Sequence, residues 1–207
     1  HQAALGSVPR SIAFPEKTNE SNVTGFLNML IAAKENKVKR FVYASSSSVY
    51  GDEPTLPKRE EKIGNPLSPY AVSKYTNELY AQVFFKTYGL ETIGLRYFNV
   101  FGPNQDPEGQ YAAVIPLFIN NILQNKPIYI NGDGSNTRDF TFVNNAVQAN
   151  ILALTTENEA AKGEIFNVAV GENFSLNDLT QSIQSILGIQ AEIIHREERA
   201  GDIKNSL

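Results

Sequence analysis

Apolar residues near the start of the chain recur every three or four positions, which is the spacing of one face of an α-helix. Within residues 22–37 they fall at Val23, Phe26, Leu27, Leu30 and Ile31. Thr18, Asn19 and Ser21 precede this run and offer side chains that can cap a helix N-terminus. We therefore predict a helix over residues 22–37.

A β-favouring run follows, and the pattern then alternates between strand and helix. Residues 40–44 are typical of a buried strand, which ends in four serines, Ser45–Ser48. After a polar loop that contains prolines, residues 69–88 have a helical pattern that Gly89 ends, and residues 91–97 are the next strand. The order helix, strand, helix, strand indicates a doubly wound parallel sheet.

The second half of the chain has shorter elements, separated by loops rich in Asn, Asp, Gly and Pro. We predict helices over residues 114–123, 144–155 and 175–187, and strands over residues 128–130, 139–143 and 164–170. The expected fold class is α/β, a Rossmann-like doubly wound parallel sheet with a smaller α/β lobe.

The first residues lack the unit with which a doubly wound nucleotide-binding fold normally opens. That unit is a strand, a glycine-rich turn and a helix whose N-terminus holds the pyrophosphate. No such turn precedes Asn22, and no helical pattern begins directly after Gly132-Asp133-Gly134. We therefore expect the sheet to be truncated at the N-terminus.

Composition narrows the classes of protein that fit this pattern. The net charge is −4 and Lys and Arg do not cluster, which argues against a nucleic-acid partner. The longest mainly apolar run, residues 26–33, is too short to cross a bilayer, and no signal peptide is visible, so we expect a cytoplasmic protein with no membrane partner. Because the chain has no cysteine and its two histidines, His1 and His195, are far apart, we expect no metal site.

The helix predicted over residues 69–88 carries a tyrosine and a lysine on one face. Tyr70 and Lys74 are four positions apart, which places them one turn from each other. A phenol with an ordinary pKa of about 10 is a poor base near neutral pH, and a cation one turn away favours its phenolate form. The pair can supply a proton acceptor; the alternative is an exposed helical pair without a function.

Four consecutive serines follow the first predicted strand. Hydroxyl groups at the carboxyl end of a parallel strand lie where open α/β sheets bind ligands. Ser46, Ser47 and Ser48 could hydrogen-bond a substrate hydroxyl or carbonyl without adding charge. The alternative is a solvated turn.

A serine at the end of one strand, followed by Tyr-x-x-x-Lys on the next helix, resembles the short-chain dehydrogenase/reductase superfamily. With the segment Arg96-Tyr97-Phe98-Asn99-Val100-Phe101-Gly102-Pro103, the chain resembles the extended branch of that family, the nucleotide-sugar epimerases and dehydratases. The resemblance implies that Ser46, Tyr70 and Lys74 are catalytic, with support from Asn22, Ser47 and Ser48. It also implies NAD as the cofactor, contacted by Ala3, Ala4, Tyr70, Lys74, Tyr97, Asn99 and Val100.

The same resemblance implies a UDP-sugar substrate. Arg138 and Arg199 match arginines that bind the diphosphate, a role that suits guanidinium groups because they bind phosphate oxygens in pairs. Tyr129 could stack on uracil or pack near it. The substrate-binding residues that the resemblance implies are Gly6, Ser7, Ser46, Asn99, Gln105, Ala113, Val114, Tyr129, Asn131, Arg138, Arg199, Asp202 and Ser206.

Within the family the sequence favours epimerisation. Ser47 and Ser48 stand where the dehydratases have an Asp-Glu pair, so the acid needed to eliminate water is missing. The chain resembles bacterial UDP-N-acetylglucosamine or UDP-N-acetylglucosaminuronate 4-epimerases of polysaccharide biosynthesis, and the small residues Gly6, Ala113 and Ser206 would leave room for an acetamido group. We expect NAD-dependent 4-epimerisation through a 4-keto sugar. The alternatives are a decarboxylase of nucleotide sugars, or a chain that is inactive alone and retains at most UDP-sugar binding.

The resemblance also implies how the chain is organised. Residues 1–103 would form the C-terminal portion of the NAD-binding Rossmann domain and carry the catalytic residues. Residues 104–207 would mainly bind the UDP-sugar, with residues 139–170 returning to the Rossmann core. We expect a homodimer in which the helices near residues 19–36 and 69–88 of both subunits form a four-helix bundle.

Overall fold

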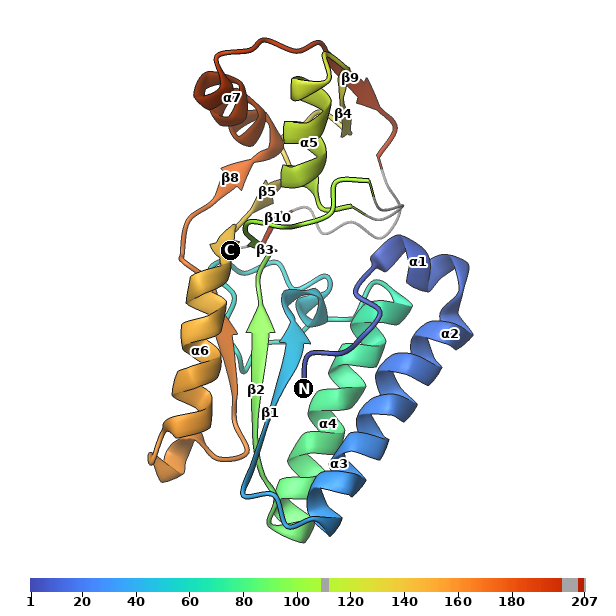
Figure 1. Cartoon of the computed structure of the whole chain (residues 1–207). Coiled ribbons are helices and arrows are strands. Elements are labelled where there is room, and N and C mark those ends of the chain that lie inside the picture. The colour runs from blue at the N-terminus through green and yellow to red at the C-terminus, as the bar shows by residue number, and fades with distance from the viewer. Residues whose placement is uncertain (109–111, 199–204, 207) are drawn as a thin grey trace.

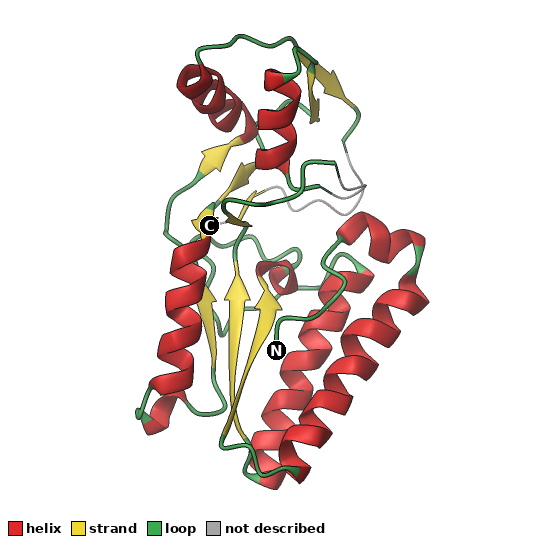
Figure 2. Ribbon diagram, viewed as in Figure 1, coloured by secondary structure: helices red, strands yellow, loops and turns green. Residues whose placement is uncertain are grey.

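The computed structural model describes residues 1–108, 112–198 and 205–206, and the chain forms two lobes (Figure 1). The sheet lobe, residues 1–97 and 143–168, has a parallel sheet with helices on both faces (Figure 2). The cap lobe, residues 114–131 and 176–196, lies beyond the carboxyl ends of the sheet strands (Figure 1).

The central sheet has three parallel strands in the order β1, β2, β7. They are β1 (Arg40–Ser46), β2 (Glu91–Tyr97) and β7 (Ile165–Val168). In register, Ser46 pairs with Tyr97, which pairs with Val168 on its other side. The carboxyl ends of all three strands therefore meet at the edge that faces the cap lobe (Figure 1). The structure confirms the predicted α/β class and parallel sheet.

Helices cover both faces of this sheet and bury its side chains. α3 (Gly25–Glu35) and α4 (Pro69–Tyr88) pack on one face, and α6 (Val143–Thr155) packs on the other. The cluster on the first face contains Phe26, Leu30, Phe41, Tyr43, Ala81 and Phe84. The cluster on the second face contains Val42, Ile93, Leu95, Ala153 and Val168. Neighbouring residues of β1 thus enter opposite layers, as expected of a strand buried on both faces.

α4 begins and ends at the residues predicted from the sequence. The Ser68 hydroxyl accepts a hydrogen bond from the Ala71 amide at 3.2 Å, and Pro69 occupies the first helical position. At the other end Gly89 adopts a φ of 67°, a left-handed conformation that glycine adopts without strain. These caps fix the orientation of Tyr70 and Lys74, which lie in the first two turns.

The helix predicted to start at residue 22 starts earlier. It begins at Pro15 as α2 (Pro15–Asn19), passes through the π-helical turn η1 (Glu20–Thr24) and continues as α3. The predicted cap residues Thr18, Asn19 and Ser21 therefore lie inside the helix. Pro15 is the physical reason, because its fixed φ suits a first helical position.

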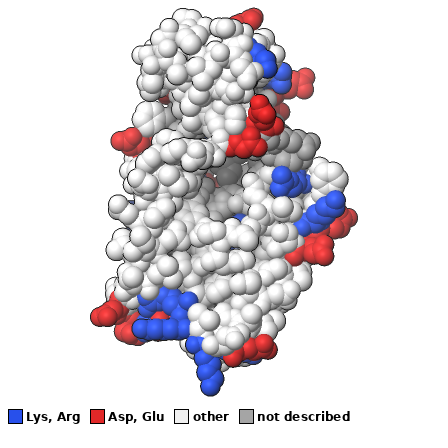
Figure 3. Space-filling view, in the orientation of Figure 1, with Lys and Arg blue, Asp and Glu red and all other residues white. Residues whose placement is uncertain are grey.

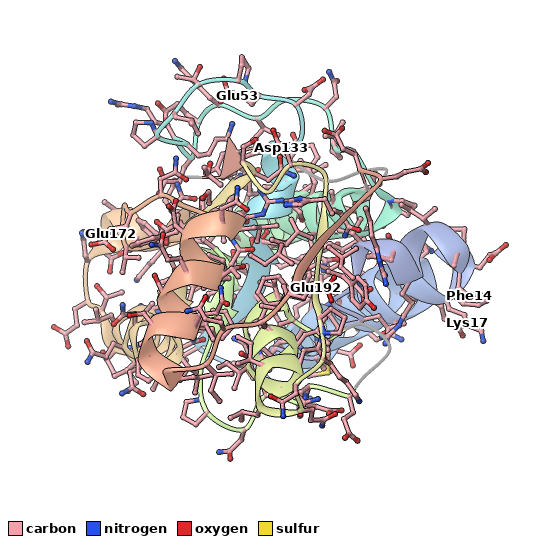
Figure 4. All side chains as sticks on the ribbon, turned by 90° about the horizontal axis from the view of Figure 1, so that it is seen from above. Phe14, Lys17, Glu53, Asp133, Glu172 and Glu192 are labelled. Carbon is pink, nitrogen blue, oxygen red and sulfur yellow. The ribbon has the colours of Figure 1, made fainter. Side chains whose placement is uncertain are left out.

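A short additional helix, α1 (Val8–Ala13), precedes it and is not predicted by the apolar pattern. The Ser7 hydroxyl caps α1 by accepting a hydrogen bond from the Arg10 amide at 3.2 Å. Seen from above, Phe14 and Lys17 project outward at the corner between α1 and α2 (Figure 4). The Lys17 ammonium lies 5.4 Å from the centre of the Phe14 ring.

The cap lobe has its own small core. α5 (Val114–Leu123) and α7 (Leu176–Leu187) pack on the parallel strands β4 (Ile128–Asn131) and β9 (Ile193–Arg196). Phe118, Ile122, Ile128, Ile130 and Ile183 are its buried side chains. The bounds of α5, β4 and α7 follow the predicted pattern closely, whereas β9 is not predicted.

Short strands and turns connect the two lobes, and here the predicted strand over residues 139–143 is wrong. The structure has two separate strands, β5 (Thr137–Arg138) and β6 (Thr141–Phe142). The break falls at Asp139, whose buried carboxylate accepts hydrogen bonds from the Val170 and Gly171 amides. The other short elements are β3 (Val100–Phe101), β8 (Phe174–Ser175), β10 (Asn205–Ser206), η2 (Ser47–Tyr50) and η3 (Glu159–Ala161).

Charged side chains lie mainly on the periphery of the molecule. Figure 3 shows a hollow between the lobes that is bordered largely by uncharged side chains. Seen from above, Glu53 and Glu172 lie at the outer edge (Figure 4). Within the described ranges, none of the helices combines the length and apolar character needed to span a bilayer.

Candidate active site

A cavity of about 410 Å³ opens at the carboxyl ends of β1 and β2, beside the N-terminal segment and the first turns of α4. It brings together a large part of the predicted catalytic and cofactor-binding set. The predicted residues that line it are Ala4, Gly6, Ser46, Ser47, Tyr70, Lys74, Tyr97, Asn99 and Val100. Gln2, Ala44, Ser45 and Phe98 also line it and are not part of that set.

A chain of hydroxyl groups leads to the Tyr70 phenol. Ser46 is the last residue of β1, and its Oγ accepts hydrogen bonds from the amide and the hydroxyl of Ser48, at 3.2 and 3.0 Å. Ser46 and Tyr70 line the same cavity, and the nearby Ser46 hydroxyl acts to lower the pKa of the Tyr70 phenol. Because Ser46 accepts from Ser48, its own proton remains available to Tyr70. Ser46 and Tyr70 are 24 positions apart in sequence. The serine loop (residues 45–48) and the Tyr-x-x-x-Lys motif therefore share one site.

Two of the titratable groups of the site, Tyr70 and Lys74, have pKa values shifted by burial. Burial raises the pKa of Tyr70, and the hydrogen bond from Ser46 acts in the opposite direction. Lys74 is 4% exposed, and burial lowers its pKa to about 8, against the attraction of the Glu78 carboxylate. The Lys74 ammonium donates a hydrogen bond of 2.9 Å to the Ala44 carbonyl oxygen. That Lys74 favours the Tyr70 phenolate stays a prediction.

Asn22 holds the N-terminal segment against the helices. Its side-chain amide accepts a hydrogen bond from the Leu5 amide at 2.7 Å and donates one to the Leu5 carbonyl at 3.2 Å. It also donates to the Ser73 hydroxyl at 3.1 Å, one residue before Lys74. Asn22 lies in the π-helical turn, a feature that often accompanies functional sites. Asn22 therefore supports the wall of the cavity next to Gly6.

A polar cluster at the rim of the cavity includes two residues that the sequence did not single out. The Tyr97 phenol accepts hydrogen bonds from the side-chain amides of Asn150 and Gln2, at 2.6 and 3.2 Å. Gln2 also donates to Asn150 at 3.0 Å. These residues come from the N-terminal segment, β2 and α6, so no local sequence signal connects them.

Asn99 and Gln105, both predicted to contact the substrate, also brace the chain between the lobes. The side-chain NH₂ group of Asn99 donates a hydrogen bond of 3.0 Å to the Asp139 carbonyl oxygen. The side-chain oxygen of Asn99 can therefore accept a hydrogen bond from another group. The Gln105 amide accepts from the Gly102 backbone and donates to the Val100 carbonyl, so it stabilises its own loop.

The remaining predicted residues do not line this cavity. Ala3 is exposed beside Ala4, and Ser7 is committed to the α1 cap. Ala113 and Val114 lie at the start of α5, Asn131 ends β4, and Ser206 in β10 pairs with Arg138 in β5. The Arg138 guanidinium donates to the Thr137 carbonyl at 2.8 Å. Arg199 and Asp202 lie outside the described residues.

Tyr129 differs from the expectation of an open stacking platform. The Arg196 guanidinium lies 3.5 Å from the centre of its ring, so one ring face is already covered. A base could stack only on the other face. Tyr129 is 39% exposed, which leaves room for such a contact.

Comparisons with known proteins show what this chain resembles. The sequence profile of the NAD dependent epimerase/dehydratase family matches residues 1–169. A UDP-glucose 4-epimerase of Mycolicibacterium smegmatis is 36% identical over 207 residues, which are 100% of this chain and 65% of that protein.

Solved structures give the same result. A UDP-N-acetylglucosamine 4-epimerase from Methanobrevibacter ruminantium, in complex with UDP-N-acetylmuramic acid, has a TM-score of 0.93 and 43% identity over 99% of this chain and 65% of that one. A UDP-glucuronic acid 4-epimerase from Bacillus cereus, in complex with UDP-glucuronic acid and NAD, has a TM-score of 0.91 and 31% identity over 99% of this chain and 63% of that one. The chain thus spans just under two thirds of the length of these relatives.

Proposed function

The chain belongs to the NAD dependent epimerase/dehydratase family, and on that premise we propose that the whole protein is a 4-epimerase of a UDP-linked N-acetylhexosamine. The observation that carries the proposal is that Ser46, Tyr70 and the buried Lys74 line one cavity, in which Ser46 acts to lower the pKa of Tyr70. In the proposal residues 1–103 carry the catalytic groups and residues 104–207 mainly bind the UDP-sugar, with residues 139–170 returning to the sheet. The proposed enzyme works in the cytoplasm and supplies polysaccharide synthesis.

The residues of the cavity fit the nicotinamide end of NAD. Lys74 uses one described hydrogen bond, to Ala44, although an ammonium can donate three. Ala4 and Gly6 are small, and a Cβ added at Gly6 would meet no atom within 4 Å, so a flat ring and a sugar have space there. Lys74, Ala4, Tyr97 and Val100 are the groups that would hold the nicotinamide and its ribose. Bound there, NAD would supply the hydride acceptor and donor for C4 of the sugar.

The protein's own groups handle the proton. Tyr70 removes the proton of the C4 hydroxyl, and Ser46 hydrogen-bonds the same oxygen as it becomes a carbonyl. Burial raises the pKa of Tyr70, so the reaction needs the Ser46 hydrogen bond and the Lys74 charge to favour the phenolate. Among the described residues that line the cavity there is no Asp or Glu to act as the acid that eliminates water, and Ser47 is one of them.

The charge of the site favours a neutral sugar over a uronate. Among the described residues that line the cavity, Lys74 is the single charged side chain, and its partner is the Ala44 carbonyl. A hexuronate would bring a carboxylate into this cavity without a second cation to neutralise it. In the proposal Arg138, together with Arg199 and Asp202, holds the UDP part, so the sugar can turn over between the two hydride transfers.

The direct test is conversion of UDP-N-acetylglucosamine to its galacto epimer, followed by proton NMR. It uses the extended protein, which is the chain joined to a glycine-rich N-terminal unit from a relative. Conversion of this sugar ahead of its uronate supports the proposal. Decarboxylation of the uronate, or no reaction of either sugar, would reject it.

The 207-residue chain by itself tests the alternative of an inactive piece. In the proposal it lacks tight NAD binding, because the pyrophosphate-binding turn is not among its residues. A thermal shift with UDP but not with NAD is the expected result.

Substitution of Gly6 by leucine tests the room for the acetamido group. A Cβ at this position meets no atom within 4 Å, so we expect the fold to be retained. The side chain would enter the cavity and lower kcat/KM for UDP-N-acetylglucosamine by about tenfold or more. Ala3→Leu is the matched control, because Ala3 is exposed and does not line the cavity. Equal kcat/KM values for both variants would contradict the proposed sugar position.

The proposed homodimer would bury apolar side chains that α3 and α4 now expose. On α4, Val72, Leu79 and Val83 are each about half exposed, at 51%, 47% and 53%, and Met29 on α3 is 44% exposed. A second copy that pairs these helices would remove this apolar surface from water.

We predict that Leu79→Arg combined with Val83→Arg converts a dimer to a monomer, measured by light scattering after gel filtration. Two buried charges per subunit without partners cannot be accommodated in a packed interface. Ile186→Arg on α7, which is 83% exposed, is the control that should remain dimeric. A dimer that survives the double change would exclude this interface.

A further inference from the structure

One ion pair is buried deep in the sheet lobe, next to the candidate active site. Glu78 on α4 and Arg96 on β2 are 1% and 2% exposed. The Arg96 Nε donates to Glu78 Oε1 at 2.9 Å and its Nη2 donates to Oε2 at 2.8 Å, which is a two-pronged contact. A buried ion pair adds little net stability over apolar residues of the same size, so its presence suggests another role.

The same pair holds the serine loop at both ends. Glu78 Oε1 accepts a hydrogen bond of 2.5 Å from the hydroxyl of Ser45, the residue before Ser46. Arg96 Nη1 donates at 3.0 Å to the phenol of Tyr50, at the end of η2. The Arg96 guanidinium also lies 4.9 Å from the centre of the Tyr50 ring. The turn from Ser46 to Ser48 thus lies between two residues that one ion pair anchors.

The pair also connects this turn to the other two groups of the site. Glu78 lies on α4 one turn after Lys74 and two turns after Tyr70. Any shift of α4 along the sheet would break the Glu78–Arg96 contact or the Glu78–Ser45 contact. Because both contacts are buried, breaking either would leave buried polar groups unpaired, which is unfavourable.

We infer that the Glu78–Arg96 pair is the positioning element of the active site: it holds the Ser46 turn and the first turns of α4 in one register. Neither residue lines the active-site cavity, so both act through Ser46, Tyr70 and Lys74. The inference rests on the proposed function for its activity measurements. Glu78 has a second effect besides positioning, because its carboxylate favours the charged form of Lys74.

Among the described residues, the charged groups that interact with Lys74 are the Glu78 carboxylate on α4 and the amino group of His1 at the N-terminus. The titratable Tyr70 phenol lines the same cavity, and Glu78 in turn interacts with Tyr43 on β1 and Arg96 on β2. Glu78 is the group whose attraction raises the pKa of Lys74 against the effect of burial. Removing its charge should therefore lower the pKa of Lys74 and move the alkaline limb of activity to lower pH.

Two variants of the extended protein test the inference. Glu78→Gln keeps the shape of the side chain and removes its charge, and Glu78→Gln with Arg96→Met leaves no buried charge unpaired. We expect both to lower kcat by about 30-fold or more, because small misplacements of reacting groups cost about that much. We expect KM for the UDP-sugar to change about twofold at most, because the pair does not contact the substrate.

A second readout does not depend on activity. The pKa of Lys74, measured by NMR of lysines labelled at Cε and assigned with Lys74→Met, should fall by about one pH unit in Glu78→Gln and by less in the double variant, because Arg96→Met also removes a positive charge. A failure of the proposed function would show as a wild-type protein that does not epimerise, and this titration would still test the pair.

The Arg40–Glu91 pair provides a matched control. It joins β1 and β2 at the other end of the sheet from Arg96, where Arg40 Nη2 lies 2.9 Å from Glu91 Oε2 and the two residues are in register. Glu91→Gln with Arg40→Met should leave kcat and the pKa of Lys74 unchanged. If Glu78→Gln does not fold, the variant that combines Glu78→Gln with Arg96→Met tests the inference. An active wild-type protein whose Glu78 double variant keeps its kcat, its pH profile and its Lys74 pKa would overturn the inference.

Discussion

Replacement of Tyr70 by phenylalanine should lower kcat of the extended protein for UDP-N-acetylglucosamine by about 10³-fold, because it removes the proposed proton acceptor. The ring fits the same space, since the substitution removes only the hydroxyl group from a residue that lines the cavity. Substrate binding should change little, so the loss should appear in kcat rather than KM. The measurement is the initial rate of formation of the galacto epimer.

Tyr75→Phe is the control for the loss of a phenol from the same helix. Tyr75 lies on α4 but does not line the active-site cavity, so its variant should retain the wild-type rate. A Tyr70→Phe protein with more than about a tenth of the wild-type kcat would show that another group takes the proton.

Replacement of Lys74 by methionine should lower kcat by about 100-fold at pH 7, because the cation that favours the phenolate is lost. The effect should depend on pH with a definite sign. The pKa of Lys74 is lowered to about 8, so below pH 8 the wild-type protein has the charge and the variant does not. As the pH rises through 8 the wild-type lysine loses its charge too, and the two rates should converge.

Rates for Lys74→Met measured from pH 6 to pH 10 check this prediction. Lys86→Met provides the control, because Lys86 is exposed in the last turns of the same helix. A ratio of wild-type to variant rates that stays constant across this range would mean that Lys74 does not act through its charge.

Local signals predicted the elements that carry the catalytic residues. Ser68, Pro69 and Gly89 fix both ends of α4, and the apolar run of β2 stands between clear turns. The start of the preceding helix was missed because residues 16–21 have no apolar side chain that extends the pattern back from Asn22. Its side chain is stabilised by Leu5 and Ser73, contacts that only the folded chain creates. The strand over residues 139–143 was wrong for the same reason, since Asp139 turns inward to bind the Val170 and Gly171 amides.

The site was predictable to the extent that its residues follow a spacing. The serines after β1 and the pair Tyr70 and Lys74 each have a local signature, and the structure places them around one cavity. Gln2 and Asn150 are 148 positions apart and share no pattern, so their meeting at Tyr97 follows from the sheet order alone. Their roles, like those assigned from the family resemblance, remain predictions for the whole protein.

The position of Glu78 had a sequence signal that was not used. It lies four residues after Lys74, so the acid shares the helix face of the two predicted catalytic groups. Its partner Arg96 begins the motif that the resemblance rests on. Sequence alone does not show that Glu78 and Arg96 meet, because they lie on different elements, α4 and β2.

Epimerisation in deuterated water tests most directly whether hydrogen leaves C4 as a hydride and returns to the same carbon. The extended protein is incubated with UDP-N-acetylglucosamine in D₂O, and the product is analysed by NMR and mass spectrometry. The hydride cycle with Tyr70 as proton acceptor predicts the galacto epimer with ordinary hydrogen at C4. Deuterium at C4, or no galacto epimer at all, would contradict it.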